Sequence, residues 1–405
     1  MIKRGRRPKV DSLYKNGQRC TFYIKHDIKA KLGVATKKVD ASLSELVNIA
    51  LDRQLKEILS GESDRIRVVS LFSGCGGMDV GFMGNFEFLD QKYKDLGFKI
   101  VFANDIVQDA CDTYENYFKH APTCLDIKKY LDGKGFMPDC DVVIGGFPCQ
   151  DFSLAGKREG FKTVRGRLYE EMRRVIIQRR PLIFIAENVK GLTNLAGALD
   201  RIKDDFASVY PGYRISDHLL MAADYGVPQT RERVIIVGVR NDCDVDFHPP
   251  SPTHAFDESN EDGRKPWVTA KEAIGKLWGT EKQANHLPNQ EHYSQAKNYG
   301  EHLQGNKPIK ADYPGPTIRA EHHGNIEFHY NKKRRLTVRE CARIQSFPDN
   351  FVFKGSGSSA YVQVGNAVPP VLAWHIAKSV KEFFYNVRKE ERLKGNKQNN
   401  VVYSV

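Results

Sequence analysis

Four residues of types that perform covalent and acid–base chemistry lie beside short apolar runs. Cys149 is in the segment GGFPCQDFS, Glu187 is in ENV, and Arg231 and Arg233 are in QTRER. A cysteine on a loop shaped by Gly and Pro is typical of a thiolate nucleophile. Taken singly, the cysteine fits a small buried hydrophobe and the arginines fit a solvated charge run. Together, a thiol, a carboxyl and two guanidinium groups indicate a catalytic site.

A glycine-rich segment, FSGCGG, follows the first of these apolar runs at Phe72. Gly74, Gly76 and Gly77 would let the backbone approach a cofactor closely, although a purely steric turn would also explain them. Asp105 ends the second run. A carboxylate at that place suits the ribose hydroxyls of an adenosine cofactor, and it fits a helix N-cap equally well.

The apolar runs predict the elements that must position these residues. The runs are 67–72, 99–104, 141–146, 182–187 and 233–239. Their β-branched residues do not alternate with polar ones, which is typical of strands buried on both faces. Helical stretches at 106–118 and 167–180 separate them, so we expect an α/β fold with a doubly wound, mostly parallel sheet. In such sheets ligands bind beyond the carboxyl ends of the strands, where the four residues lie.

Six motifs in order give the sequence a family resemblance. FSGCGG, GGFPCQDFS, ENV, QTRER, RLTVRECARIQSFPD and GNAVPP resemble the motifs of bacterial DNA cytosine-5 methyltransferases of restriction–modification systems. The resemblance covers the chain from Ile66 to the final helix. It implies a Rossmann-like methyltransferase fold with S-adenosylmethionine as methyl donor. The variable region between QTRER and RLTVRE then corresponds to a smaller, loop-rich target-recognition domain.

The resemblance also assigns roles to the catalytic residues. Cys149 would add to C6 of cytosine and make C5 nucleophilic, and Glu187 would share a proton with N3. Arg231 and Arg233 would orient the base and offset negative charge. Because C6 is inaccessible inside a duplex, the cytosine must be flipped out of the helix.

Further site residues carry over by matching positions in the motifs. The expected cofactor-binding residues are Phe72, Gly74, Gly76, Gly77, Asp105, Ile106, Asp126, Ile127, Phe147, Pro148 and Asn366. The expected DNA-binding residues of the catalytic domain are Gln150, Ser153 and Arg165. The sequence departs from the family at two of these positions, where Asp105 is shorter than the frequent Glu and Ile106 replaces a frequent aromatic residue. We expect both departures to weaken cofactor binding without abolishing it.

The changes in pattern along the chain predict its domain organisation. The expected segments are a basic arm (1–18), an N-terminal module (19–60), a linker (61–65), a catalytic domain (66–240), a target-recognition domain (241–335), a motif-bearing segment with the C-terminal helix (336–390) and a tail (391–405).

The N-terminal module resembles a ribbon-helix-helix domain. Residues 19–25 alternate as a half-buried strand, and a capping box at Ser42 opens a helix. In that fold two chains pair their strands, so we expect a homodimer with Thr21, Tyr23 and Lys25 facing DNA base edges. A strand–helix adaptor packed on the catalytic domain is the alternative. Repression of the protein's own gene and tethering to DNA are the two tasks that the module could serve.

Composition limits the remaining classes of protein. The 62 Lys and Arg exceed the 50 Asp and Glu, and this net charge of +12 favours a polyanionic partner, above all nucleic acid. The family resemblance implies that this partner is double-stranded DNA. The eight cysteines form no C-x-x-C pair, which argues against a zinc site and a disulfide framework. We therefore expect no metal, no membrane span, and a reducing prokaryotic cytoplasm with the enzyme at the nucleoid. A cognate restriction endonuclease is the expected functional partner.

Three other functions compete with DNA methylation. A zinc nucleobase deaminase needs a second cysteine three residues after the first, and Phe152 occupies that position. A methyltransferase acting on RNA cytosine stays open, although the long variable region and the basic N-terminus favour DNA. A DNA-binding regulator with a decayed site is disfavoured, because Cys149, Glu187, Arg231 and Arg233 are all present.

Overall fold

The computed structural model describes residues 12–15, 18–21, 65–148, 168–195, 197–256, 263–294, 307–320 and 326–401, and for 12–15, 18–21, 392 and 394–401 it describes the backbone alone. The chain divides into two compact units, residues 1–65 and 66–405. The larger unit contains the central sheet and both hydrophobic cores.

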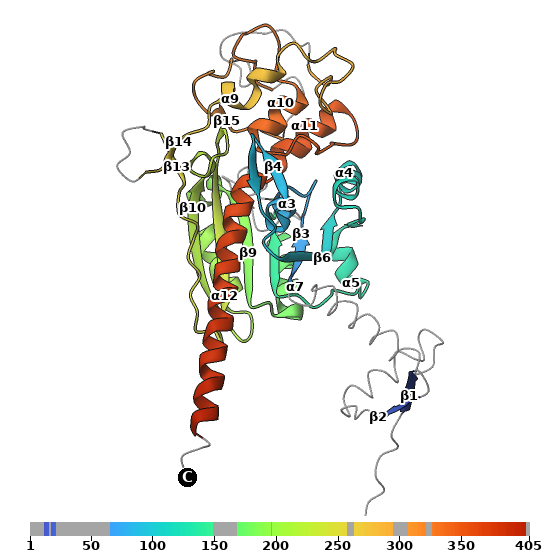
Figure 1. Cartoon of the computed structure of the whole chain (residues 1–405), viewed down its shortest axis with the longest axis vertical. Helices are drawn as coiled ribbons and strands as arrows, with labels where there is room; N and C mark the ends of the chain where they lie inside the picture. Colours follow the sequence, from blue (N-terminus) through green and yellow to red (C-terminus); the bar gives the residue numbers. More distant parts are fainter. Residues whose placement is uncertain are drawn as a thin grey trace, which may run out of the picture. The chain divides into compact units, whose positions relative to one another are not determined.

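Among the described residues the central sheet has seven strands, in the order β10-β12-β9-β8-β3-β6-β7 (Figure 1). Their bounds are β3 (Ile66–Leu71), β6 (Phe98–Asp105), β7 (Thr123–Cys124), β8 (Val142–Gly145), β9 (Ile183–Val189), β10 (Tyr213–Met221) and β12 (Glu232–Arg240). Strands β9, β8, β3, β6 and β7 run parallel, and β12 runs antiparallel to both β9 and β10. All five predicted runs form strands, which confirms the mostly parallel α/β fold.

The two hydrophobic cores lie on opposite faces of this sheet. Val68 and Ile144 belong to one core, whereas Val69 and Val143, their neighbours in the chain, belong to the other. Successive side chains of a strand point to opposite faces, so a sheet covered on both faces needs apolar residues at every position. This explains why the runs in the sequence do not alternate.

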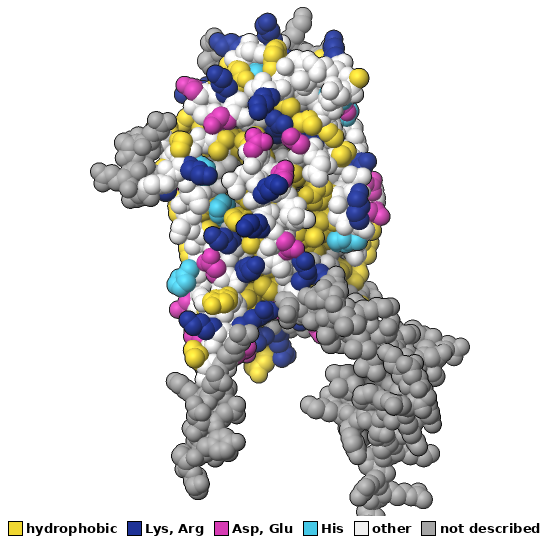
Figure 2. All heavy atoms as spheres, in the orientation of Figure 1, with side chains coloured by type: hydrophobic (Ala, Val, Ile, Leu, Met, Phe, Trp, Pro, Cys, Tyr) yellow, Lys and Arg dark blue, Asp and Glu magenta, His cyan; other side chains and the backbone are white. Residues whose placement is uncertain are grey.

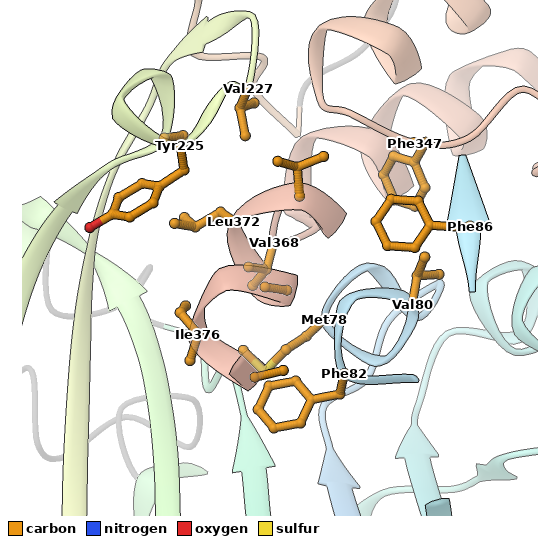
Figure 3. Packing of buried hydrophobic residues seen from close by; sticks show 14 of the residues in the cluster. Met78, Val80, Phe82, Phe86, Tyr225, Val227, Phe347, Val368, Leu372 and Ile376 are labelled. Atoms are coloured by element: carbon orange, nitrogen blue, oxygen red, sulfur yellow. The ribbon is translucent and has the colours of Figure 1, made fainter. Parts of the chain in front are cut away.

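Helices cover both faces of the sheet. They are α3 (Gly77–Met83), α4 (Gln108–Phe118), α5 (Ile127–Asp132), α7 (Leu168–Arg179), α8 (Ala198–Ala207) and α12 (Pro370–Val401), with the 3-10 turns η3 (Lys190–Asn194) and η4 (Ala222–Tyr225) and the hairpin β4 (Phe86–Phe88) and β5 (Gln91–Tyr93). Figure 3 shows Met78 and Phe82 of α3 beside Leu372 and Ile376 of α12 in the first core. Buried residues of α7 and α8 belong to the second core. No described helix is both long and apolar enough to cross a membrane.

The variable region contains only short elements where it is described. They and their neighbours are β11 (Gln229–Thr230), β13 (His254–Ala255), β14 (Lys265–Pro266), α9 (Ala270–Ile274), η5 (Gly275–Leu277), β15 (Gly315–Pro316), α10 (Val338–Ile344) and α11 (Gly357–Asn366). The motif RLTVRE anchors this region to α10. Thr337 and Glu340 form a capping box, and Arg334 donates to the Glu340 carboxylate at 2.7 and 2.8 Å while lying over the Trp278 ring. Charged groups thus fix the start of α10 beside the variable region, whose buried apolar residues such as Ile274, Leu277 and Ile318 belong to the first core.

Three features of the larger unit differ from the sequence-based expectation. Strand β10 was not predicted, because polar residues interrupt its apolar ones on an edge of the sheet. The direction of β12 was not predicted either. The segment 391–405 was expected to be a frayed tail, but α12 continues as a helix to Val401.

In the smaller unit, part of the expected basic arm forms a strand. β1 (Ser12–Lys15) pairs antiparallel with β2 (Gln18–Thr21) of the same chain. The expected strand 19–25 is thus present up to Thr21. Tyr23, Lys25 and the capping box at Ser42 lie outside the described residues. Pairing of this module between two chains stays a prediction.

Charged side chains are mixed on the face where α12 lies. Figure 2 shows Lys and Arg interspersed with Asp and Glu over the described part of this face, without a continuous basic stripe. Duplex DNA attracts a basic surface through its phosphates. The face in Figure 2 therefore lacks the charge pattern expected of a DNA-binding surface, within the described residues.

The first core contains an ionisable group, Asp79 of α3. Its side chain is fully buried, and its Oδ1 accepts a hydrogen bond of 2.7 Å from the Ser70 hydroxyl. Burial raises the pKa of Asp79 from 3.8 to about 6, although the bond from Ser70 opposes the rise. The native state therefore holds this proton more tightly than the unfolded chain does.

We expect Asp79 to lower stability as the pH rises from about 4 to about 6, by about 3 kcal/mol, because the buried carboxyl must ionise. Asp79→Asn keeps an acceptor for Ser70 and removes the ionisation. The variant should therefore gain stability relative to wild type between pH 4 and pH 7. Urea unfolding of both proteins at the two pH values measures this gain. A difference in unfolding free energy that does not change with pH would contradict the account.

Candidate active site

The antiparallel pairing of β12 with β9 brings Glu187 and Arg233 together. Arg233 is paired with Val189 in the register, and Glu187 with Ile235. The two charged side chains are thus diagonal neighbours on one face of the sheet, within reach of each other. Arg233 Nε lies 2.7 Å from Glu187 Oε1, and only 8% and 11% of the two side chains are exposed. The pair stands at the carboxyl end of β9, where the sequence placed it.

The turn after β8 is shaped around the Glu187 carboxylate. A Cβ added to Gly146 would lie 2.8 Å from Glu187 Oε2, so any larger residue would displace the carboxylate. The neighbouring Asn188 is buried, and its Nδ2 donates to the Phe147 carbonyl at 3.1 Å. This bond fixes the turn two residues before Cys149. Sequence reasoning did not assign a role to Asn188, although its place in ENV was a signal.

The catalytic loop itself is outside the described residues from Cys149 to residue 167. Cys149, Gln150, Ser153 and Arg165 therefore stay predictions. The described chain reaches Pro148, one residue before Cys149, on a turn held by Asn188.

Arg231 is buried at the start of β12 and donates to backbone carbonyls. Its Nη1 donates to Ile318 at 2.9 Å, and its Nη2 donates to Gly365 at 2.8 Å and to Ala367 at 3.2 Å. Its terminal nitrogens thus join the start of β12 to the segments of Ile318 and of Gly365 and Ala367. The expected role of Arg231 in orienting the base stays a prediction.

Gln229 makes a second link at the same place. Its Oε1 accepts from the Ile318 amide at 3.1 Å, and its Nε2 donates to the Ile344 carbonyl at 3.2 Å. Gln229 is fully buried. The strand start that carries Arg233 is therefore bonded to the segment that leaves the variable region, and the motif QTRER connects the two parts.

Both arginines are in a dry environment. Burial lowers the pKa of Arg231 well below 12.5, and the charge of Arg233 lowers it further, while Glu187 opposes the shift. Burial also lowers the pKa of Arg233, against the attraction of Glu187. Two guanidinium groups thus lie near one carboxylate, so the electrostatic potential at the site is positive. Such a site favours a ligand oxygen that carries or develops negative charge.

The glycine-rich segment forms a turn that is tied to the end of β6. Ser73 donates its amide to the Asn104 carbonyl at 2.9 Å, and Gly74 donates its amide to Asp105 Oδ2 at 2.8 Å. Gly74 has a φ of +55°, and a Cβ there would meet no atom within 4 Å. A glycine is needed for the left-handed backbone, and the space beside it is open to a ligand.

Two further glycines allow close packing behind this turn. A Cβ on Gly76 would come within 2.4 Å of the Phe118 ring, and one on Gly77 within 2.5 Å of the Val368 carbonyl. Gly77 therefore brings the turn against the segment that follows Asn366, which is exposed at the end of α11. Phe72, before the turn, is itself held at a φ of +53°.

Asp105 is bonded to the turn that precedes α4. Its Oδ1 accepts from the amides of Ile106 and Val107 at 2.8 and 2.9 Å, but the N-cap of α4 is Val107, so Asp105 does not cap that helix. The carboxylate is half-buried and faces the glycine turn through Gly74. The Ile106 side chain beside it is 65% exposed, which is unusual for isoleucine. A carboxylate and an exposed apolar side chain at one strand end fit the ribose and the adenine of S-adenosylmethionine.

Three expected cofactor residues have different surroundings. Asp126 caps α5 by accepting from the Lys128 amide at 2.8 Å. The Ile127 side chain is 3% exposed and belongs to the second core, and the expected contact of Asp126 and Ile127 with the adenine edge stays a prediction. Leu125, which is 43% exposed, is the apolar side chain available there. Phe147 is also buried in the second core, where it supports the turn from behind.

Comparison with known proteins decides between the remaining readings. A family model described as C-5 cytosine-specific DNA methylase matches residues 66–382. The chain belongs to the C-5 cytosine-specific DNA methylase family. It is therefore a DNA cytosine-5 methyltransferase that uses S-adenosylmethionine as methyl donor. The resemblance drawn from the six motifs is confirmed.

Bacterial relatives support the same conclusion. The chain is 36% identical to the Type II methyltransferase M.NgoFVII of Neisseria gonorrhoeae, over 82% of this chain and 91% of the relative. It is 35% identical to the Type II methyltransferase M.BspRI of Lysinibacillus sphaericus, over 91% of this chain and 93% of the relative. The methylase is thus of the Type II restriction–modification kind.

Solved structures share the fold. A DNA modification methyltransferase described from a prophage in E. coli superposes with a TM-score of 0.57 at 24% identity, over 79% of this chain and 99% of that one. The Entamoeba histolytica methyltransferase EhMeth superposes with a TM-score of 0.55 at 16% identity, over 78% of this chain and 98% of that one. At these identities the likeness supports the methyltransferase fold alone.

Proposed function

We propose that this methylase transfers a methyl group to C5 of a flipped-out cytosine in a specific duplex sequence, through a covalent bond between Cys149 and C6. The observation that carries the proposal is the buried pair of Glu187 and Arg233 beside the turn that leads to Cys149. A nucleophile, a proton donor and a positive group then converge on one rim of the sheet. S-adenosylmethionine supplies the electrophilic methyl group.

The chain's residues each perform one part of this reaction. The Cys149 thiolate adds to C6, and the electrons of the C5–C6 double bond move through the ring to N3. Glu187, which takes up a proton from solvent before the base binds, passes that proton to N3. Arg233 binds the carbonyl oxygen of the base, where negative charge develops. After C5 has taken the methyl group, Glu187 recovers its proton from N3. Loss of the C5 proton to solvent and expulsion of Cys149 restore the aromatic ring.

The residues around the glycine turn hold the methyl donor. Asp105 would accept from the ribose hydroxyls, and Ile106 would lie against the adenine. Gly74 leaves open space beside the turn, and Asn366 would contact the methionine part. The turn and Asp105 are bonded to each other, which supports their action as one site.

The burial of the catalytic pair supports base flipping. Glu187 and Arg233 are nearly inaccessible to solvent, so a cytosine stacked in a duplex has no route to them. A single extruded base gives up its stacking and pairing, for a few kcal/mol, and can then approach the pair. The DNA must therefore bind at the carboxyl ends of β8 and β9.

The Type II relatives suggest the biological task. We propose that methylation by this chain protects the host DNA from a cognate restriction endonuclease, which is the functional partner. The smaller unit adds DNA binding as a homodimer, with Thr21, Tyr23 and Lys25 at base edges, and represses the enzyme's own gene.

We expect Cys149→Ser to abolish methylation while the affinity for S-adenosylmethionine stays within about twofold of wild type, because different strand ends bear the nucleophile and the cofactor site. Calorimetric titration and transfer of a labelled methyl group to duplex DNA measure the two properties. Duplex DNA with 5-fluorocytosine at the target should trap wild type covalently and leave the variant free. Methylation by the variant would overturn the covalent mechanism.

For the smaller unit, we expect the full chain to sediment as a dimer and to protect one site in its own promoter. Tyr23→Ala should remove the preference for that site while non-specific binding persists, because phosphate contacts give most of the latter. A monomeric chain that protects no promoter site would contradict the regulatory proposal. The methyltransferase assay on the same samples is independent of this outcome.

A further inference from the structure

A pair of cysteines lies at the adenosine end of the expected cofactor site. Cys111 is on α4, and Cys124 is on β7, where it is paired in register with Asp105 of β6. The Cys111 thiol donates to the Asp105 carbonyl at 3.9 Å, and the Cys124 thiol donates at 3.4 Å to Oε1 of Gln108, three residues before Cys111 on the same helix. Both cysteines thus lie beside the residue that is expected to hold the ribose.

The two thiols differ in exposure. Cys111 is 3% exposed, whereas Cys124 is partly exposed and donates to Gln108 Oε1 at 3.4 Å. Neither forms a disulfide in the structure. Burial raises the pKa of the Cys111 thiol, and the neighbouring Cys124 thiol raises it further, so the two side chains interact. The family chemistry uses neither of them, because its nucleophile is Cys149.

We propose that Cys111 and Cys124 are a modification site that closes to a disulfide with low-molecular-weight disulfides, and that the closed form binds the methyl donor more weakly. The weaker binding of the methyl donor rests on the proposed placement of its adenosine end at Asp105 and Ile106. Formation of the disulfide does not depend on that placement.

The closure is a pair of thiol–disulfide exchanges. Cys124, as thiolate, attacks one sulfur of a small disulfide such as glutathione disulfide, forms a mixed disulfide and releases one thiol. Cys111 then gives up its proton and attacks the Cys124 sulfur, which releases the second thiol. Two protein thiols are oxidised, and the small disulfide is reduced to two thiols that carry the two protons. Burial raises the pKa of the Cys111 thiol, so the more exposed Cys124 reacts first.

The new disulfide removes two hydrogen bonds beside Asp105 and Ile106, where the adenosine end of the cofactor is expected. Cys124 loses the S–H that it donates to Gln108, and Cys111 loses the one that it donates to Asp105. Gln108 begins α4, directly after the exposed Ile106 and Val107. The covalent bond also ties α4 to β7 at this point. The position of Ile106 relative to the Asp105 carboxylate therefore changes, and cofactor binding weakens.

The test uses the full chain with Cys149→Ser, which removes the nucleophilic thiol of the active site as a competing target. The protein is incubated with glutathione disulfide, and the remaining thiols are then alkylated. Trypsin separates the two cysteines, because cleavage after Lys99, Lys119 and Lys128 gives one peptide of residues 100–119 and another of residues 120–128. Mass spectrometry detects their disulfide-linked form directly. Titration with S-adenosylmethionine is done before and after oxidation.

We expect the linked peptides as the main oxidised product, a rise in Kd of about fivefold or more, and reversal of both by dithiothreitol. Cys124→Ser in the same background should show neither change, whereas Cys140→Ser, a control at a buried cysteine outside the pair, should show both. Absence of the linked peptides overturns the modification site. Linked peptides with an unchanged Kd overturn the effect on the cofactor. A reduced protein that does not bind S-adenosylmethionine would instead count against the proposed cofactor placement.

Discussion

The active site depends on one constraint, the antiparallel pairing of β12 with β9. In this register the start of β12 lies beside the end of β9, so Arg233 and Glu187 meet at 2.7 Å. If β12 were parallel to β9, Arg233 would lie at the amino end of β9, away from Glu187. The same chain segment carries Gln229 and Arg231, whose bonds to Ile318 fix a part of the variable region. The catalytic pair and the connection to the variable region are therefore set together.

Burial strengthens the electrostatic interactions that Glu187 and Arg233 can make with a base. Taking an ion pair out of water gains little net stability, because desolvation offsets the attraction between the charges. The dry site strengthens interaction with a base that develops charge, and Arg231 adds a second positive group nearby. Gly146 and Asn188 keep the opposite wall in place, since one leaves room for the carboxylate and the other holds the Phe147 carbonyl. The fold thus positions the acid before any substrate is bound.

The sequence predicted the strands better than their direction. Runs such as 67–72 and 141–146 are apolar throughout because both faces of the sheet are covered, and that signal is local. The direction of β12 depends on the chain between β9 and β12, which includes β10, and no residue pattern marks it.

Within the site, the motifs placed Glu187 and Arg233 on one rim of the sheet, and the structure brings the two side chains together. The motifs did not reveal that Arg231 donates to carbonyls distant in the sequence, nor that the Ile127 side chain is buried at the start of α5. Burial and backbone partners of single side chains are tertiary properties, so the motif alone left them undetermined.

The most direct measurement of the central claim is the single-turnover methylation rate of Gly146→Ala, which removes no charge and only adds a Cβ 2.8 Å from Glu187 Oε2. Gly191→Ala is the matched control, because its Cβ would meet only Val189, at an ordinary 3.7 Å. If the chemistry requires Glu187 where Gly146 and Arg233 hold it, Gly146→Ala lowers the rate about 100-fold, with cofactor affinity and Tm close to those of the control. A rate equal to that of Gly191→Ala would contradict the account.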